Sequence, residues 1–441
     1  MESLFAATCK MPRFDSLDTS IKTDVLVIGG GIAGILVAHQ LSLAGVDTVL
    51  LEQNRLCSGV TQNTTAKITA QHRLCYAKLL SSKGLEAAQL YYRANMEALE
   101  AYCRLAKTVE CDFQKSNSYV YSVTDRRSLE QELEALERIG ANAYFAQELP
   151  LPFLTRGAVC LPDQAQLHPL RFLAEIARSL RIFEQTGVKA IEKHRAICES
   201  GAEIRAEQIV VATHFPFLNR HGGYPLKMYQ SRSYTLALDG APDFEGMYVD
   251  AEREGFSFRH YKKHLLIGGA GHRTGFEGGG YKRLEELAEH SYPDANAVYR
   301  WAAQDCMTLD DLPYIGRYAR STSGLLVATG FGKWGMTSAM VAARLLTDLV
   351  LGRDNPYAAL FSPSRSMLKP GLAVNLWVTL SHYLCPRAPR CSHLGCALSW
   401  NPHEHSWDCP CHGSRFSQEG ELLDNPATKG LCDPPGPTKE K

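Results

Sequence analysis

Two short segments near the C-terminus place cysteines and histidines at a spacing suited to metal binding. CSHLGC holds Cys391 and His393, and CPCHGS holds Cys409 and His412, with 15 residues between the two pairs. Zinc would accept two thiolates and two imidazoles, but zinc fingers group cysteine with cysteine and histidine with histidine. One cysteine and one histidine from each segment suit a [2Fe-2S] cluster with both cysteines on one iron and both histidines on the other. The spacing therefore favours an iron-sulfur centre over zinc.

A glycine-rich loop near the N-terminus is typical of dinucleotide binding. Gly29, Gly31 and Gly34 match the GxGxxG pattern after a short apolar run that predicts a buried strand, and a helix pattern follows. These glycines allow the tight turn, the approach of the backbone to a pyrophosphate and close packing of helix on strand. The next apolar run ends at Glu52, 18 residues past Gly34, where a carboxylate can accept hydrogen bonds from an adenosine ribose and repel a 2′-phosphate. This unit predicts FAD or NAD and disfavours NADP.

A second glycine loop lies far downstream. Gly330, Gly332 and Gly335 in GFGKWG match the same pattern between a predicted strand and a predicted helix. No second strand ending in an acid follows, so a second dinucleotide site is not expected. The N-terminus of the predicted helix would instead stabilise negative charge on a reduced flavin ring.

These motifs together resemble the D-amino-acid oxidase family of FAD-dependent oxidoreductases. The resemblance covers residues 23–365 and includes GVTQNTTAKITAQH, DLPYIG and GFGKWG. It implies that the flavin lies between the first glycine loop, the segment with Thr64, Thr65 and Lys67, and the second glycine loop. A simpler interpretation of the two threonines is that they cap a helix.

The two Cys/His segments resemble the Rieske iron-sulfur family. By that similarity the two cysteines bind one iron, the two histidines bind the other, and Ser414 donates a hydrogen bond to the cluster. Cys396 and Cys411, one in each segment, could bridge the segments as a disulfide. Phe416 stands where respiratory Rieske proteins have tyrosine, and the loss of this hydroxyl predicts a lower reduction potential. Only about 25 residues precede the first ligand after FSPSRS, so the base sheet is expected to be truncated on its N-terminal side.

The expected fold class is α/β (α+β), with a Rossmann-like FAD-binding domain, an antiparallel-sheet substrate domain and a small all-β Rieske domain. The strand alternation around 226–273 predicts the antiparallel sheet, and Ala- and Leu-rich patterns predict helices around 66–107 and 128–140. The predicted boundaries are an oxidoreductase unit at 23–365 (FAD-binding part about 23–85, 150–224 and 306–355; substrate part about 86–149 and 225–305), a Rieske domain at 366–430 and a disordered tail at 431–441.

Composition limits the partners and the compartment. In 441 residues, 47 lysines and arginines balance 47 aspartates and glutamates, so no net charge recruits nucleic acid. No signal segment and no membrane span are recognisable, which predicts a cytoplasmic protein. In such a chain most of the 14 cysteines are expected to be reduced core residues or metal ligands.

Flavin enzymes of this family oxidise C–N bonds, so the resemblance implies an amine or amino-acid-like small-molecule substrate. A flavin and a Rieske centre together would convert a two-electron oxidation into one-electron transfer to an external acceptor. Two alternatives stay open: a reductase that takes electrons from an external donor, and a non-catalytic redox sensor or electron carrier.

The catalytic residues are not identified by a motif. Candidates for the substrate pocket are Arg259, His260 and Tyr261 on one predicted strand, and Lys333 with Trp334 beside the second glycine loop. Ordinary packing is the alternative for each. Glycine-oxidase-like relatives place an arginine shortly before LPYIG to hold the substrate carboxylate, and Asp305 occupies this place here. We therefore hypothesise that an amino-acid carboxylate is not held at that point.

Overall fold

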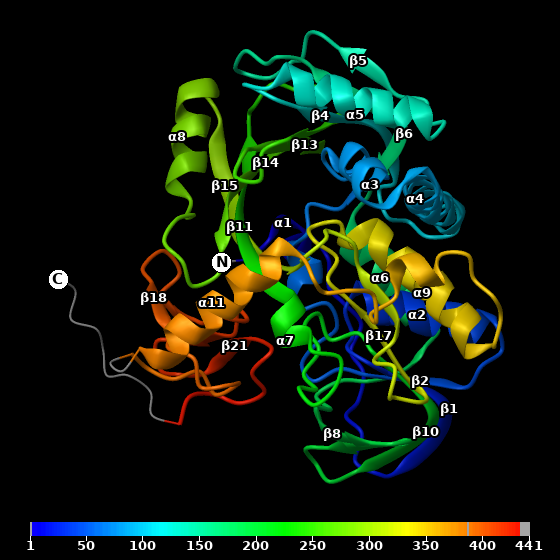
Figure 1. Cartoon of the computed structure of the whole chain (residues 1–441). Helices are drawn as coiled ribbons and strands as arrows, with labels where there is room; N and C mark the ends of the chain where they lie inside the picture. Colours follow the sequence, from blue (N-terminus) through cyan, green and yellow to red (C-terminus); the bar gives the residue numbers. More distant parts are fainter. Residues whose placement is uncertain (1, 386–387, 433–441) are drawn as a thin grey trace.

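The structure is a computed structural model that describes residues 2–385 and 388–432 and contains three β-sheets (Figure 1). Helices and strands alternate along the first part of the chain, and the last part forms a small separate sheet. The mixed α/β architecture is confirmed. Among the described residues, no helix combines the length and the apolar character needed to cross a bilayer.

The first sheet carries both glycine loops. Its order is β16-β17-β10-β1-β2-β7; in addition, β9 pairs with β10, and β8 pairs with β9. The central strand β1 is almost wholly buried in its second half because both faces of this parallel part are covered. The strands are β1 (Ile21–Ile28), β2 (Thr48–Leu51), β7 (Arg181–Phe183), β8 (Val188–Glu192), β9 (Arg195–Cys198), β10 (Glu203–Val211), β16 (Tyr314–Arg317) and β17 (Leu325–Thr329).

Helices α2 (Ile32–Leu43) and α9 (Gly335–Val350) pack against each other after the two glycine loops. Strands β1 and β17 precede these loops, and both run parallel to β10. Because the carboxyl ends of parallel strands meet at one edge of a sheet, the two glycine loops lie at the same edge.

The second sheet is larger and runs in the order β15-β11-β14-β13-β12-β4-β6-β3, with β5 beside β6. Its strand pairs are antiparallel as predicted, except that β12 and β4 run parallel. These two strands come from distant segments, so no hairpin turn fixes their relative direction. The strands are β3 (Lys67–Ile68), β4 (Gln114–Tyr121), β5 (Tyr144–Ala146), β6 (Ala158–Gln166), β11 (Met228–Asp239), β12 (Met247–Asp250), β13 (Ser257–Tyr261), β14 (His264–Arg273) and β15 (Asn296–Thr308).

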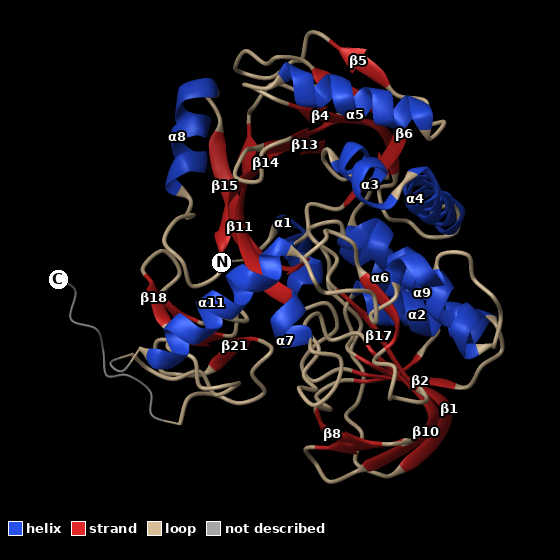
Figure 2. Ribbon diagram, in the orientation of Figure 1, coloured by secondary structure: helices blue, strands red, loops and turns tan. Residues whose placement is uncertain are grey.

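Figure 2 shows α5 over the β4 and β6 part of the second sheet and α8 beside β15, while α3 and α4 pack against each other. The predicted helical stretch from residue 66 begins later than expected, because β3 occupies its start and α3 starts at Cys75. The other helices up to α10 are α1 (Leu4–Thr8), η1 (Val60–Asn63), α3 (Cys75–Lys83), α4 (Leu85–Leu105), α5 (Arg126–Arg138), α6 (Pro169–Ala177), α7 (Tyr224–Lys227), α8 (Lys282–Ser291) and α10 (Ala358–Phe361).

The third sheet contains β18 (Ser399–Asn401), β19 (Ser406–Asp408), β20 (Arg415–Ser417) and β21 (Leu422–Asp424). Helix α11 (Pro370–Leu384) precedes this sheet and lies across its front in Figure 1. On this N-terminal side the sequence predicts a truncated base sheet, and the segment there is this helix. Of the predicted tail, residues 433–441 lie outside the described residues. The predicted disordered tail includes Leu431, but this residue is held in place. Its amide donates to the carbonyl oxygen of Gly420 (2.8 Å), and its side chain packs against the small sheet.

Candidate flavin cavity and iron-sulfur centre

The first glycine loop is built for close contact. Gly29 has a left-handed φ of 111°, and a Cβ atom on Gly34 would lie 1.8 Å from the carbonyl oxygen of Gly29. Gly31 lies at the N-cap of α2, so the helix begins where the loop ends. At positions 29 and 34 only glycine fits, because a Cβ atom there would lie 2.5 Å or less from a backbone carbonyl oxygen.

Glu52 follows β2 directly, and its side chain contacts the first glycine loop. Its Oε2 accepts a hydrogen bond from the Gly30 amide (2.6 Å), and its Oε1 accepts one from the Asn54 amide (2.7 Å). Burial raises the pKa of Glu52, and these two amides oppose that effect. The carboxylate thus holds the loop, and its predicted bond to a ribose stays a prediction.

The second glycine loop faces the same space. Gly330 has φ 72°, and a Cβ atom there would lie 2.4 Å from Cγ2 of Thr308. The Gly332 amide donates to the carbonyl oxygen of Cys306 (3.0 Å), which fixes the loop on β15. Helix α9 begins at Gly335, so its positive end points toward this space.

One cavity of about 1520 Å³ joins these elements. Every predicted flavin-binding residue except Gly34 lines it, and Gly34 lies behind Gly29. Thr64 ends the short helix η1 instead of capping a helix start, and its hydroxyl accepts from the Ala66 amide (3.0 Å). The cradle of glycines, the acid at the end of β2 and the size of the cavity fit FAD.

Lys67 places an amine inside this cavity. Its Nζ donates to the hydroxyls of Thr65 (3.2 Å) and Ser257 (3.4 Å), and no described carboxylate pairs with it. Burial lowers the pKa of Lys67 to about 7, and the charge of Arg259 contributes. An electron-rich group on the ligand would stabilise this ammonium.

Arg259, His260 and Tyr261 do not line the cavity, so the cavity gives no support to their prediction as pocket residues. Arg259 is fully buried and donates to the carbonyl oxygen of Ala66 (3.0 Å), while Tyr261 donates to Asp112 (2.7 Å). Helix α1 covers this end of β13, with the ring of Phe5 5.2 Å from that of Tyr261. No pattern in the sequence indicates that this N-terminal helix packs there.

Lys333 and Trp334 do line the cavity. Nζ of Lys333 lies 3.3 Å from Oδ2 of Asp305 and 3.2 Å from the Ser233 hydroxyl. Burial lowers the pKa of Lys333, and the charge of Asp305 opposes this. Trp334 stacks on His72 with ring centroids 4.6 Å apart. The carboxylate of Asp305 therefore offsets the positive charge of Lys333 in the cavity.

The two Cys/His segments form adjoining tight loops. Each loop is closed by a backbone hydrogen bond. The Gly395 amide donates to the carbonyl oxygen of Cys391 (3.0 Å), and the Gly413 amide donates to that of Cys409 (2.9 Å). Both glycines have left-handed φ values, 76° and 85°. The turns aim Cys391 and Cys409 at each other, and hydrogen bonds from the thiols of Cys391, Cys396 and Cys411 lower the pKa of Cys409.

The two predicted histidine ligands also meet. The rings of His393 and His412 have centroids 5.0 Å apart and are nearly perpendicular. Their Nδ1 atoms are buried and have no hydrogen-bond partner, while Nε2 of His393 bonds to Oδ1 of Asn219 (2.8 Å). A proton on Nε2 leaves the Nδ1 lone pair free to bind metal. Two such imidazoles beside two thiols fit a [2Fe-2S] cluster.

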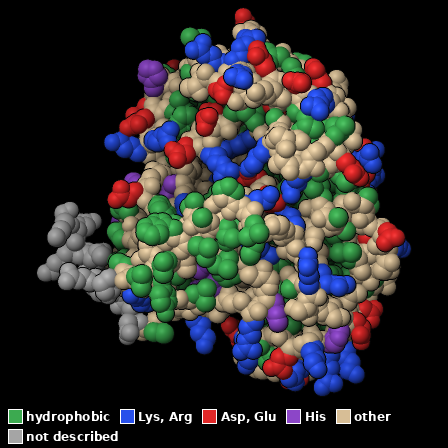
Figure 3. Space-filling view, viewed as in Figure 1, with side chains coloured by type: hydrophobic (Ala, Val, Ile, Leu, Met, Phe, Trp, Pro, Cys, Tyr) green, Lys and Arg blue, Asp and Glu red, His purple; other side chains and the backbone are tan. Residues whose placement is uncertain are grey.

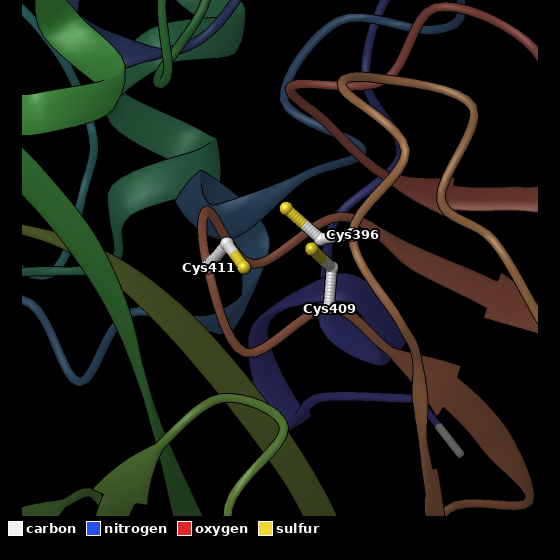
Figure 4. Close-up of side chains that lie close together, drawn as sticks. All are labelled: Cys396, Cys409 and Cys411. Atoms are coloured by element: carbon white, nitrogen blue, oxygen red, sulfur yellow. The ribbon is translucent and has the colours of Figure 1, made fainter. Parts of the chain in front are cut away.

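Cys396 and Cys411 are free thiols in the structure. Their Sγ atoms and that of Cys409 lie within 4.8 Å of one another (Figure 4). The predicted disulfide stays a prediction. Ser414 is buried beside Cys391, accepts from the Ala427 amide (2.9 Å) and helps to lower the pKa of the Cys391 thiol against larger raising effects from Cys409 and burial. Phe416 is buried opposite Trp407, and its effect on the potential is untested.

A pair of glutamines connects the cavity to the second Cys/His loop. Gln304 lines the cavity and donates to the carbonyl oxygen of Gly413 (2.8 Å) and to Oε1 of Gln230 (2.9 Å). Gln230 in turn donates to the carbonyl oxygen of His412 (2.9 Å). The second Cys/His loop therefore contacts β11 and β15, and residues 422–425, from β21 and just after it, form part of the cavity wall.

A buried ionic group strengthens this contact. Arg232 of β11 pairs with Glu404 and lies 3.7 Å from Asp424, and Arg415 of β20 pairs with Glu404 (3.3 Å) and Asp424 (3.0 Å). Burial alone would raise the pKa of Glu404, but the hydrogen bond and charge of Arg232, with the charge of Arg415, hold it below its ordinary value.

Glu404→Gln is expected to lower the unfolding free energy at neutral pH by about 1–3 kcal/mol, the cost of weakening a buried charged hydrogen bond. A carboxylate with a depressed pKa stabilises the fold above its ordinary pKa of 4.5 and loses this effect as the pH falls through its lower folded value. The gap between wild type and variant should therefore narrow below pH 4.5. Thermal unfolding across the acidic range checks this, and a gap that widens on acidification would contradict it.

Comparison with known proteins agrees with both parts of the chain. The model of the FAD dependent oxidoreductase family (DAO) matches residues 24–349, and that of the Rieske [2Fe-2S] domain matches residues 373–435. The Rieske 2Fe-2S iron-sulfur protein YhfW of Bacillus subtilis (strain 168) is 34% identical, with 98% of this chain and 97% of that protein covered.

Two further proteins resemble the first part. Gamma-glutamylputrescine oxidoreductase of Escherichia coli (strain K12) is 24% identical over 79% of this chain and 89% of its own length. The crystal structure of glycine oxidase from Geobacillus kaustophilus superposes with a TM-score of 0.67 at 20% identity, covering 78% of this chain and 99% of that one. The chain thus belongs to the FAD dependent oxidoreductase (DAO) family and carries a C-terminal Rieske domain, which makes it an enzyme whose cofactors are FAD and a [2Fe-2S] cluster.

Proposed function

We propose that this enzyme oxidises a C–N bond of an amine or amino acid and passes the electrons singly, through the Rieske centre, to an external acceptor. FAD supplies the acceptance of two electrons from an organic substrate, and a [2Fe-2S] cluster carries one electron at a time. Relatives named for gamma-glutamylputrescine and glycine support this substrate class.

The contact of Gln304 and Gln230 with the second Cys/His loop carries this proposal. One glutamine side chain both lines the cavity and donates to the loop that holds His412. A cavity and a metal loop this close allow electrons to pass within the chain, without an external carrier between the two centres.

The assignment of residues follows the same proposal. The first glycine loop with Glu52 would hold the ADP half of FAD, and the remaining cavity residues would surround the flavin ring. Cys391 and Cys409 would bind one iron, and His393 and His412 the other. The proposed units are an oxidoreductase part at 23–365 and a Rieske part at 366–430.

The direction of electron flow can be tested anaerobically on the purified holoenzyme. A panel of amines and amino acids is added, and flavin absorbance and the electron-spin signal of the reduced cluster are followed in time. Bleaching by one of these substrates, followed by the cluster signal, is the expected result. Reduction only by an external electron donor would favour the reductase, and no turnover with any donor would favour the sensor or carrier.

Asp305→Asn is expected to change the pH dependence of this reaction. Asp305 raises the pKa of Lys333 against the lowering by burial, so its loss should lower the pKa of Lys333 further. The lysine then loses its proton at a lower pH, and the alkaline limb of kcat/KM should move to lower pH.

Ser233→Ala, which removes a neutral partner of the same Nζ, should move the alkaline limb less. An unchanged limb in Asp305→Asn would contradict a role of the Lys333 charge. Asp305→Arg tests instead whether position 305 contacts the substrate. If turnover and substrate choice are unchanged in this variant, that result counts against any substrate role of this position.

A further inference from the structure

Helix α11 exposes a row of large apolar side chains on one face of the protein. Figure 3 shows hydrophobic side chains gathered over this helix. Trp377 is 69% exposed and Leu384 is 67% exposed. Between Pro370 and Leu384 the sequence contains no charged residue. The members of this surface, the α11 patch, are Leu368, Val374, Leu376, Trp377, Leu380, Tyr383, Leu384 and Leu394, all exposed. Single exposed apolar residues are ordinary, but a contiguous uncharged group indicates a contact surface.

The opposite face of α11 is fixed to both parts of the protein. Asn375 is buried, donates to the carbonyl oxygen of Leu226 (3.1 Å) and accepts from Arg273 (3.0 Å). The backbone of His382 accepts from the Ala397 amide (3.0 Å), next to the first Cys/His loop. The buried side of the helix is formed by Asn375 and Val378, and these contacts leave the apolar outer face exposed.

We infer that the α11 patch rests on the surface of a lipid bilayer. Trp377 and Tyr383 have rings with one polar end, which suits the headgroup level, and the leucines suit the acyl region below it. The helix has 15 residues, too few to cross a bilayer, so it would lie along the surface. Lys369 at one end of the helix would meet anionic headgroups. Arg390 adds positive charge beyond the other end, although its guanidinium also donates to the carbonyl oxygens of Tyr383 (3.0 Å) and Gly395 (3.1 Å).

A second copy of the chain fits the same patch less well. If two α11 helices paired antiparallel, Lys369 of each copy would come near Arg390 of the other. If they paired parallel, identical residues would meet. Both arrangements bring cations together. An anionic bilayer is complementary to these cations and also covers the apolar row.

The bilayer contact would bring the first Cys/His loop to the headgroup level. Leu394 follows the proposed ligand His393 and is part of the patch. The ring of Tyr383 lies close to this loop, since a Cβ atom on Gly395 would lie 3.8 Å from its Cε2. This loop is therefore the part of the iron-sulfur centre that faces the membrane.

Sedimentation of the holoenzyme with lipid vesicles tests the inference. The wild type should sediment with vesicles of phosphatidylcholine and phosphatidylglycerol, and less with phosphatidylcholine alone. Trp377→Glu and Leu380→Glu should each lower the bound fraction at least about tenfold, because each removes a large apolar side chain from the contact. Leu154→Glu is the matched control, since Leu154 is 95% exposed and lies outside the patch, and its binding should be unchanged.

Unchanged flavin and iron-sulfur spectra show that each variant is folded. A wild type that stays in the supernatant with both kinds of vesicle overturns the inference, as does equal binding by all variants. Light scattering tests whether a second copy occupies the patch instead. If the protein does not bind vesicles but forms a dimer that Trp377→Glu dissociates, the patch is a dimer interface and the inferred bilayer contact is wrong. Because vesicle binding needs no turnover, its failure would leave the proposed function untouched.

Discussion

Gly34→Ala is expected to leave the purified protein without flavin. The new Cβ atom would lie 1.8 Å from the carbonyl oxygen of Gly29, and backbone cannot yield as the end of a side chain can. Either the loop or the start of α2 must move, and both form the proposed pyrophosphate site. The affinity for FAD should fall at least about a hundredfold, which is roughly 3 kcal/mol. Flavin absorbance per chain after purification, and after addition of free FAD, measures this.

Gly45→Ala is the matched control at the other end of the same helix. Gly45 also has a left-handed φ, 79°, but its Cβ atom would have nothing within 4 Å. Alanine there should cost about 1 kcal/mol of stability and leave the flavin bound. Full flavin content in Gly34→Ala would contradict the assignment of this loop to the cofactor.

Cys409→Ser is expected to remove the iron-sulfur signal while the flavin remains. Cys409 is fully buried, and its pKa is lowered well below the ordinary thiol value, first by the Cys391 thiol. A thiolate is the form that binds iron, and a serine hydroxyl is a much poorer ligand. The signal should drop below about a tenth of wild type, since even residues behind the ligands alter metal affinity 10–100-fold. Substrate should still bleach the flavin, but electrons should no longer reach a one-electron acceptor.

Two controls separate loss of a ligand from general damage. Cys411→Ser removes a thiol of the same group without removing a proposed ligand, and should keep most of the iron. His405→Asn changes an exposed histidine with φ 51°, a backbone conformation that asparagine tolerates. If Cys411→Ser lost the cluster and Cys409→Ser kept it, the ligand assignment would be wrong.

The parts of the site that could be predicted from the sequence are those whose structure is determined by residues within one short segment. Glycine is needed at position 34 because loop and helix touch, and the structure shows that contact between Gly34 and Gly29. The paired Cys/His segments carry both a metal donor set and the glycines of their turns. Such local constraints do not depend on what packs against them.

The features that were missed depend on distant packing. Helix α1 covers the end of β13 and removes Arg259 and Tyr261 from the cavity, although nothing in their strand pattern indicates it. Residues 422–425 of the small sheet line the cavity, because the ionic group around Arg232 and Glu404 holds that sheet on β11. His214 also lines the cavity with φ 64°, and its sequence context gave no signal. Contacts between segments 100 or more residues apart leave little trace in one sequence.

The absorption and electron-spin spectra of the purified protein, with iron and zinc counted, test most directly whether both redox centres are present in one chain. The account predicts a flavin spectrum, the signal of a [2Fe-2S] cluster with mixed cysteine and histidine ligands after reduction, and two irons per chain without zinc. Flavin alone with zinc bound at the C-terminal loops, or a colourless protein, would contradict it.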